Sequence, residues 1–253
     1  MTDRVIEGLR ANSINKGNIS FDLIRNFAGI DLNLWDRLGR GRAILNSEEE
    51  LDQYLYTYGP MISSQWRIIL YELGNLNLPR TDIEISDYAC GQGLACLLLH
   101  DVLPDSALGN ITKVNLIEPS SVALTRAVGI TECCFPNASI NPIKKHLDCL
   151  DRDDLNLSEG PFKIHLFSNI LDMEGFNQYL LLEKILKTPG THLIMVASHD
   201  RNHNGGSQRI RETYQTMIDK TYAEWYEVTG NSISYFNCYN RQPAIFFHVE
   251  LKI

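Results

Sequence analysis

Two glycines between an apolar strand-like run and an apolar helix-like run could bind a cofactor. The run begins at Ile83, and the chain passes through Gly91 and Gly93 before the helix-like "LACLLL". A strand that leads through such a turn into a helix brings bare backbone to the carboxyl edge of a sheet, where open α/β sheets bind ligands. Glycine also permits a positive φ and leaves room for a ligand against the main chain. Alone the pattern is weak, because an ordinary glycine turn has the same sequence.

A carboxylate at the end of the next apolar run strengthens this interpretation. Glu118 follows "KVNLI" and precedes Pro119. At the tip of a second strand it can accept charge-assisted hydrogen bonds from both hydroxyls of a ribose. The alternative is a solvated acid before a proline turn. Together, the Gly-x-Gly turn and Glu118 predict a site for a nucleotide-like cofactor.

The elements that position these residues form an alternating pattern. From residue 83 onward, strand-like and helix-like runs alternate, which is typical of a parallel sheet with helices on both faces. The expected strands are 83–88, 113–119, 139–147, 162–170, 192–199, 232–240 and 244–253, and the main helices between them are 93–103, 120–134, 176–186 and 207–226. The last two strands are separated by three residues, so they must form an antiparallel hairpin. The sequence predicts an α/β fold with a Rossmann-like, doubly wound, mostly parallel seven-stranded sheet and an antiparallel C-terminal hairpin.

Residues 1–80 show no sustained strand pattern, and they are predicted to form an N-terminal helical extension before a domain of residues 81–253. Ser47 and Glu50 are spaced as a capping box and start a predicted helix over about 48–58. The Gly59-Pro60 pair is predicted to end this helix, and a second helix is expected from Pro60 to about residue 76. These helices carry residues that could close over a ligand or pack as a cap, namely Tyr54, Tyr58, Gln65 and Trp66.

Three segments resemble motifs of the class I S-adenosylmethionine-dependent methyltransferases. "DYACGQG" is similar to their first motif, "LIEPS" to the acidic motif that ends the second strand, and "FKIHLFSNILDM" to the motif beside the methyl-transfer site. The resemblance covers about residues 80–253 and includes the terminal hairpin. Ala89 stands where the family commonly has glycine, which leaves the turn more crowded. The resemblance implies that the cofactor is S-adenosylmethionine and that the reaction is methyl transfer without a metal.

The resemblance also implies roles for the residues that match the motifs. Asp87 would orient the turn and meet the methionine amino group, directly or through water, and Glu118 would hold the ribose hydroxyls. Further contacts are implied for Ala89, Gly91 and Gly93 in the turn, for Asp148 and the backbone of Cys149 beside the adenine, and for Ser168 and Asn169 near the sulfonium. Three further acids compete with Asp148, although a solvated acidic loop is the alternative for each of them: Asp151, Asp153 and Asp154.

Candidates for catalysis follow the fourth and fifth strands. Asn169, Asp172 and His199 are predicted to converge on the sulfonium. Asp172 could position or deprotonate an acceptor, or it could cap the next helix. His199, next to Asp200, could act as a general base or be a hydrogen-bonded histidine at a strand end. His203 is a further candidate in the next loop. Whether a base is needed depends on the acceptor, which the sequence leaves open.

The formal net charge of −8 argues against a surface that binds polyanions in general. We therefore expect a small-molecule or protein acceptor, with RNA kept as an alternative, and no strong nucleic-acid signature. The six cysteines form no Cys-x-x-Cys pair, and no segment resembles a signal peptide or a membrane span. The sequence thus predicts a cytoplasmic protein with reduced thiols, no metal site and no membrane partner.

Two other functions share parts of this pattern. One is a methyltransferase-fold module that binds a protein partner without turnover, because the acceptor side carries no distinctive motif. The other is a nicotinamide-dependent dehydrogenase, because the Gly-x-Gly turn and the acid after the second strand serve both cofactor classes. The dehydrogenase motif lacks its third glycine here, since Cys96 stands at that position, and the terminal hairpin does not suit it.

Overall fold

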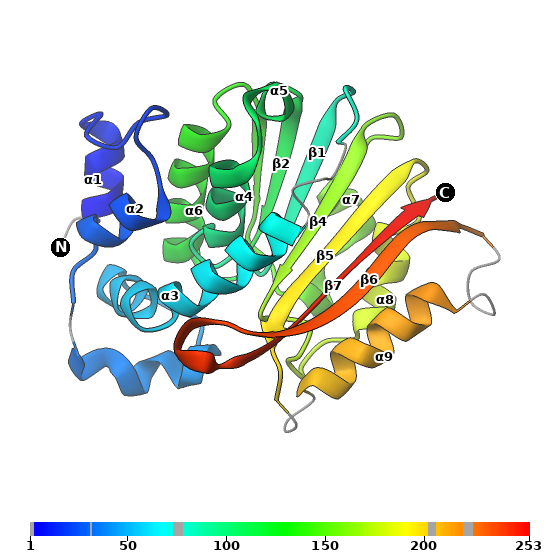
Figure 1. Cartoon of the computed structure of the whole chain (residues 1–253). Coiled ribbons are helices and arrows are strands. Elements are labelled where there is room, and N and C mark those ends of the chain that lie inside the picture. The colour runs from blue at the N-terminus through cyan, green and yellow to red at the C-terminus, as the bar shows by residue number, and fades with distance from the viewer. Residues whose placement is uncertain (1–2, 31, 73–77, 202–205, 220–224) are drawn as a thin grey trace.

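The computed structural model describes residues 3–30, 32–72, 78–201, 206–219 and 225–253, and its centre is a seven-stranded sheet (Figure 1). The strand order is β3-β2-β1-β4-β5-β7-β6, with parallel pairs among the first five strands and β7 antiparallel to β5 and β6. The strands are β1 Ile83–Tyr88, β2 Ile111–Ile117, β3 Ser139–Ile143, β4 Phe162–Ser168, β5 Thr191–His199, β6 Glu227–Asn237 and β7 Pro243–Lys252. The predicted fold class, including the C-terminal hairpin, is confirmed.

Helices cover both faces of the sheet. In Figure 1, α3, α4 and α6 lie over one face, and α7, α8 and α9 lie over the other. The helical elements are α1 Arg4–Arg10, α2 Phe21–Phe27, η1 Leu32–Gly41, α3 Glu48–Glu72, α4 Leu94–Val102, α5 Asp105–Leu108, α6 Ser121–Cys134, η2 Leu147–Cys149, α7 Arg152–Leu155, α8 Gln178–Ile185, α9 Gly206–Ile218 and η3 Tyr239–Arg241. In the described part of the chain, no helix combines the length and the apolar character that crossing a bilayer requires.

The central strands are apolar on both sides because each face of the sheet has its own core. Ile164 and Leu166 of β4 belong to the core beneath α3, α4 and α6, whereas Phe167 belongs to the core beneath α8 and α9. Successive side chains of a strand point to opposite faces, so a strand buried on both sides reads as a continuous apolar run. This is why β1 could be predicted to the residue.

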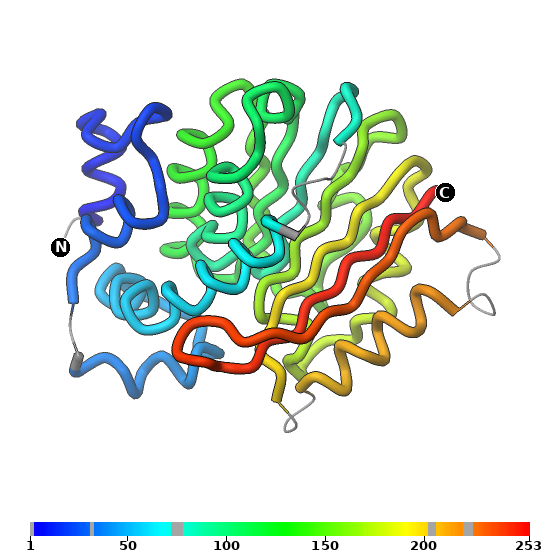
Figure 2. Tube along the Cα trace, in the orientation of Figure 1, coloured from blue at the N-terminus to red at the C-terminus, as the bar shows by residue number. Residues whose placement is uncertain are grey.

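The prediction that Gly59-Pro60 divides two helices is wrong. Helix α3 is continuous from Glu48 to Glu72, with Pro60 inside it (Figure 2). A residue before proline normally leaves the helical region because its Cβ clashes with the proline ring, and Gly59 has no Cβ. A Cβ at that position would also lie only 3.0 Å from Leu55 and 3.2 Å from Phe21. The glycine therefore permits both the helix and its close packing.

Several predicted boundaries also shift. Helix α3 is described only to Glu72, and the remainder of the predicted run to residue 76 lies outside the described residues. Helix α9 ends at Ile218, so Tyr226 at the end of the predicted helix is not helical and instead donates a hydrogen bond to the Met217 carbonyl. The third strand ends at Ile143, where the chain turns toward η2. The division of the chain at residue 80 stays a prediction.

A chain of buried hydrogen bonds crosses the sheet on the side of α8. The Tyr88 hydroxyl lies 3.1 Å from Nδ1 of His165, and Nε2 of His165 lies 2.9 Å from Nδ1 of His192. Nε2 of His192 lies 2.8 Å from the carbonyl oxygen of Thr188, so this nitrogen must carry a hydrogen. His192 then accepts from His165, and His165 accepts from Tyr88. Every group is satisfied only when both rings are neutral.

This chain predicts that acid destabilises the fold. Burial lowers the pKa of His165 well below its ordinary value and that of His192 to about 4. As the pH falls from about 6.5 toward 4, the unfolded chain binds protons that the folded chain excludes, so stability is lost. We expect a His165→Leu/His192→Leu variant to be less stable at pH 7. Between pH 6.5 and pH 5, the free energy of unfolding of the wild type should fall by roughly 2–4 kcal/mol more than that of the variant, because only the wild type carries the two buried histidines.

The measurement is urea denaturation at several pH values, with His146→Gln as the control because His146 is exposed. The control should keep the wild-type pH dependence. An equal pH dependence in the double variant and the wild type would contradict the assignment of neutral rings.

Candidate functional site

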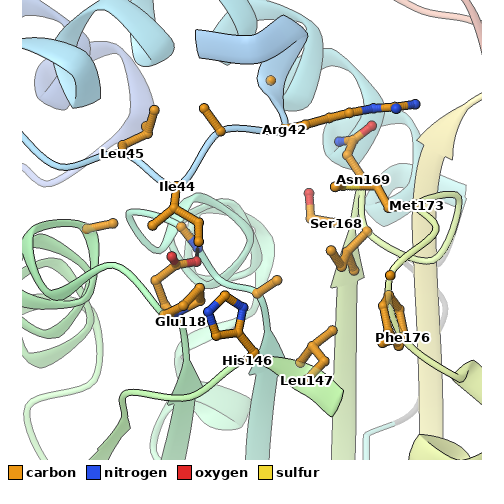
Figure 3. Close-up of a pocket in the computed structure, with 18 of the residues that line it drawn as sticks. Arg42, Ile44, Leu45, Glu118, His146, Leu147, Ser168, Asn169, Met173 and Phe176 are labelled. Atoms are coloured by element: carbon orange, nitrogen blue, oxygen red, sulfur yellow. Dashed lines mark hydrogen bonds between the residues drawn. The ribbon is translucent and has the colours of Figure 1, made fainter. Parts of the chain in front are cut away.

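A cavity of about 290 Å³ lies at the carboxyl ends of β1, β2 and β4 (Figure 3). Its walls come from the turn after β1, the end of β2, the segment after β3 and the end of β4. Residues 41–45, which connect η1 to α3, cross above these strand ends and form a roof. The cavity therefore lies where open α/β sheets bind ligands.

The turn after β1 presents bare main chain to this cavity. Ala89 and Gly91 line the cavity and both have left-handed φ angles, 54° and 53°. A Cβ on Gly91 would meet no atom within 4 Å, so this residue faces open space. The left-handed conformation of Ala89 is one that glycine adopts without strain, which agrees with the glycine common in the resembled motif.

Gly93, for which the resemblance implies a cofactor contact, is the N-cap of α4. It does not line the cavity, and its φ is 82°. A Cβ there would lie 3.1 Å from Cα of Ala127 in α6. Gly93 is required by its backbone conformation and by the close packing of α4 against α6.

Glu118 lines the cavity at the end of β2 and is held by backbone amides. One carboxylate oxygen accepts from the Gly91 amide at 3.1 Å, and the other accepts from the Ser120 amide at 2.9 Å. The side chain is buried, and burial raises the pKa of Glu118 although the two amides act to lower it. The carboxylate is thus fixed beside the open main chain of Gly91.

Asp87 lies beneath the turn and not on the cavity wall. It is fully buried, and neither carboxylate oxygen has a hydrogen-bond partner. Burial raises the pKa of Asp87 to about 7, although the nearby amide and thiol of Cys96 act to lower it. A buried carboxyl group without partners is costly, so a donor from a ligand would relieve it.

The segment after β3 supplies the third wall. Asp148, which was expected beside the adenine, lines the cavity together with His146 and Leu147, two residues that no motif of the sequence indicates. Cys149 is exposed and lies outside the lining residues. None of the competing acids lines the cavity: Asp154 accepts from Lys145 and from the Asp151 amide, and Asp151 and Asp153 are exposed.

The end of β4 is tied to helix α3 by two side-chain pairs. Nε1 of Trp66 donates to the Ser168 hydroxyl at 3.0 Å, and Nδ2 of Asn169 donates to Oε1 of Gln65 at 2.9 Å. Ser168 and Asn169 line the cavity, and Asn169 has a left-handed φ of 55°. Helix α3 therefore fixes the side chains expected to lie nearest the methyl group.

No protein-family model matches the sequence, and neither does any curated protein. A Listeria monocytogenes protein assigned to the class I S-adenosylmethionine-dependent methyltransferases is 14% identical, with a TM-score of 0.52 over 99% of this chain and 79% of that chain. The chain has the class I methyltransferase fold. Two other similar structures each have a TM-score of 0.48. The plantazolicin methyltransferase BpumL in complex with SAH is 10% identical, and the match covers 97% of this chain and 98% of that chain. An S-adenosylmethionine-dependent methyltransferase from Anabaena variabilis is 14% identical, and the match covers 80% of this chain and 91% of that chain.

Asp172 and His199 lie beyond the end of the cavity and do not line it. Asp172 is buried and forms an ion pair with Arg201, and its second oxygen has no partner. It does not cap α8, because Asn177 is the N-cap of that helix. Burial is the main cause that lowers the pKa of His199, with a further contribution from Arg201.

Of the other candidates after β5, Asp200 lies 3.8 Å from Arg211, and His203 lies outside the described residues. Within the described ranges, no three His, Cys, Asp or Glu side chains are grouped so that they could hold a metal ion.

The roof was not identified from the sequence. Leu38, before the segment, and Leu45, at its end, pack in a small core with Leu51 and Ala123. The Ser120 hydroxyl donates to the Leu45 carbonyl and also accepts from the Ala123 amide as the N-cap of α6. A signal was present in "LGRGRAIL", where two glycines permit the left-handed turn and two leucines anchor its ends.

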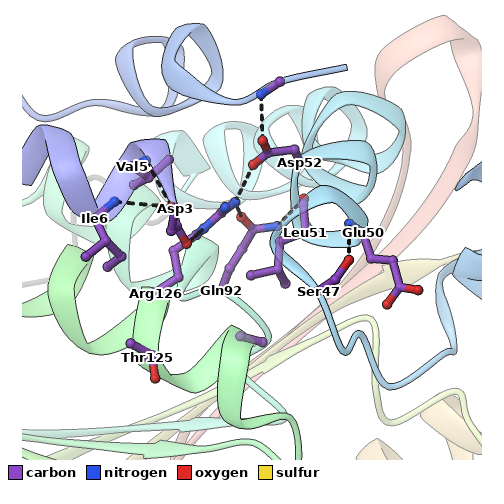
Figure 4. Close-up of polar contacts among 12 residues, drawn as sticks. Asp3, Val5, Ile6, Ser47, Glu50, Leu51, Asp52, Gln92, Thr125 and Arg126 are labelled. Carbon is purple, nitrogen blue, oxygen red and sulfur yellow. Dashed lines mark hydrogen bonds and ion pairs between the residues drawn. The ribbon is translucent and has the colours of Figure 1, made fainter. Parts of the chain in front are cut away.

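A fully buried arginine joins the N-terminal helices to the turn of the site (Figure 4). Nε of Arg126 in α6 lies 2.7 Å from Asp3, and Nη1 lies 2.8 Å from Asp52 and 3.1 Å from Oε1 of Gln92. Asp3 is the N-cap of α1, and Asp52 belongs to α3. The Gln92 amide in turn donates to the Leu51 carbonyl. Gln92 stands between the two glycines, so this network holds the turn in place.

We predict that Arg126→Met destabilises the protein by about 3–5 kcal/mol, because two carboxylates would remain buried without their cation. The matched control is Arg37→Met, since Arg37 is exposed and lies 3.9 Å from Glu50, a contact expected to contribute at most about 1 kcal/mol. Urea denaturation at pH 7 measures both. Equal losses in the two variants would show that the buried network contributes little.

Proposed function

We propose that the protein binds S-adenosylmethionine in this cavity and transfers its methyl group to an acceptor. The observation that carries the proposal is Gly91, whose open main chain faces the cavity beside the fixed carboxylate of Glu118. A ribose that lies against bare backbone and shares its hydroxyls with an acid needs this combination of groups.

The residues around the cavity fit the parts of this cofactor. Glu118 would accept from the ribose hydroxyls, and Asp148 with Leu147 would border the adenine. Asp87, which lies beneath the turn, would meet the ammonium group of the methionine portion through water, and its unpartnered oxygens support this role. Ser168 and Asn169 would border the sulfonium. When bound, the cofactor supplies an activated methyl group, so the protein's own contribution is alignment of the acceptor in a cavity that excludes water.

The strand order disfavours the dehydrogenase alternative. Dinucleotide-binding domains commonly have a parallel sheet in the order 3-2-1-4-5-6. Here β7 is inserted antiparallel between β5 and β6, and position 96 is a buried cysteine where the dinucleotide motif has its third glycine. A binding module without turnover has the same fold and is separated from an enzyme by experiment.

We predict that Glu118→Gln weakens the binding of S-adenosylhomocysteine by roughly 1–3 kcal/mol, because the hydrogen bonds to the ribose lose their charge. Glu174→Gln is the matched control, since Glu174 lines the same cavity but is exposed. Titration calorimetry measures both. Unchanged affinity in Glu118→Gln would contradict the ribose assignment.

Turnover is tested with S-adenosylmethionine labelled in its methyl group and a cell extract separated into small molecules, protein and RNA. The proposal expects incorporation of the label into one of these fractions. A protein that binds S-adenosylhomocysteine but labels no fraction would be a binding module.

A further inference from the structure

Arg42 in the roof is a cation without a counterion. It is the only lysine or arginine among the described residues that line the cavity. Its side chain is half-buried, and no acidic side chain of the described chain lies within 4 Å of it. A guanidinium presents a planar set of donors that matches a carboxylate. A half-buried guanidinium without such a partner therefore points to an anionic ligand.

The place of Arg42 assigns this ligand to the acceptor end. In Figure 3 the side chain extends over the end of β4 toward Asn169, and Glu118 lies at the other side of the cavity. Met173 and Phe176 supply apolar wall at this end of the cavity. An acceptor at this end would have an apolar body and one anionic group.

The ionisable groups near Arg42 are paired, protonated or exposed to solvent, and His146, which also lines the cavity, lies beside Glu118 in Figure 3. Asp172 is paired with Arg201 outside the cavity, and the amide of Asn169 is engaged by Gln65. Burial raises the pKa of Tyr54, which keeps its phenol protonated. Glu174 lines the cavity but is exposed to solvent. An acceptor that must lose a proton finds no buried, unpaired base beside Arg42, whereas an acceptor that is already ionised needs none.

We infer that the acceptor is a small-molecule carboxylic acid with an apolar body, and that the product is its methyl ester; this rests on the function proposed above. One carboxylate oxygen binds Arg42 and the other attacks the methyl carbon. The oxygen–carbon bond forms, the carbon–sulfur bond breaks, and its electron pair remains on sulfur. The anionic oxygen and the cationic sulfonium both become neutral, and no proton is transferred.

The first test uses the full-length protein, methyl-labelled S-adenosylmethionine and the small-molecule fraction of a cell extract, together with phenylacetate, benzoate and octanoate. 2-Phenylethanol and phenylacetamide serve as matched acceptors without a carboxylate. Methyl esters release methanol in mild alkali, so the inference expects most of the transferred label to become volatile after this treatment. Alkali-stable label, or label in the protein or RNA fraction, would overturn this inference and leave methyl transfer intact. A protein that transfers no label to any fraction would contradict both the carboxylic-acid acceptor and the proposed methyl transfer.

The second test asks whether Arg42 binds the acceptor or the cofactor, because the methionine portion of the cofactor also carries a carboxylate. Arg42→Gln should lower kcat/KM for the acceptor at least about tenfold, equivalent to about 1.4 kcal/mol, and leave the affinity for S-adenosylhomocysteine within about twofold. Arg42→Lys should restore part of the loss because it keeps the charge.

The matched control is Arg40→Gln, because Arg40 lies two residues before Arg42 but is exposed and does not line the cavity. It should change kcat/KM by less than about twofold. If Arg42→Gln lowers the affinity for S-adenosylhomocysteine by the same factor as kcat/KM, the guanidinium binds the cofactor and the inference is overturned. An equal loss in Arg40→Gln would also overturn it, because the effect would then be one of overall charge.

Discussion

The buried guanidinium of Arg126 is the constraint on which the arrangement of the site depends. A cation removed from water is stable only if carboxylates and other acceptors surround it in good geometry. Asp3, Asp52 and Gln92 meet this requirement, and they come from α1, α3 and the turn after β1. Because a displacement of any one of them would leave a charge or an amide unpaired, the N-terminal helices and the Gly-x-Gly turn are fixed relative to each other.

The cavity is consequently built by both parts of the chain. The sheet supplies its floor through the ends of β1, β2 and β4, and the N-terminal segment supplies its roof and the wall that carries Tyr54. Helix α3 also contacts the end of β4 through Gln65 and Trp66. A helical segment that could be read as an appendage to a cofactor domain therefore determines the space left for the acceptor.

The sequence predicted what depends on local pattern and missed what depends on distant partners. The bounds of β1 and the place of Glu118 follow from apolar periodicity and from the position of an acid after a strand, so both could be predicted. Arg126 could not, because its carboxylate partner Asp3 is 123 residues away and an arginine within a helix has no local signature. Pro60 misled for a related reason, since the packing of α3 on both sides overrides a local signal for a helix end.

The groups left unpaired are as informative as those that are paired. Arg126, Asp172 and Asn169 all have protein partners, so they serve to hold the site in one geometry. Among the described residues at or beneath the cavity, the Asp87 carboxyl and the Arg42 guanidinium have no hydrogen-bond or ion-pair partner, and Gly91 faces open space although its amide donates to Glu118. Methyl transfer from a sulfonium depends mainly on alignment, because charge is lost and not gained in the transition state. A site whose paired side chains are fixed, with open main chain for the cofactor and one cation for the acceptor, is suited to this alignment.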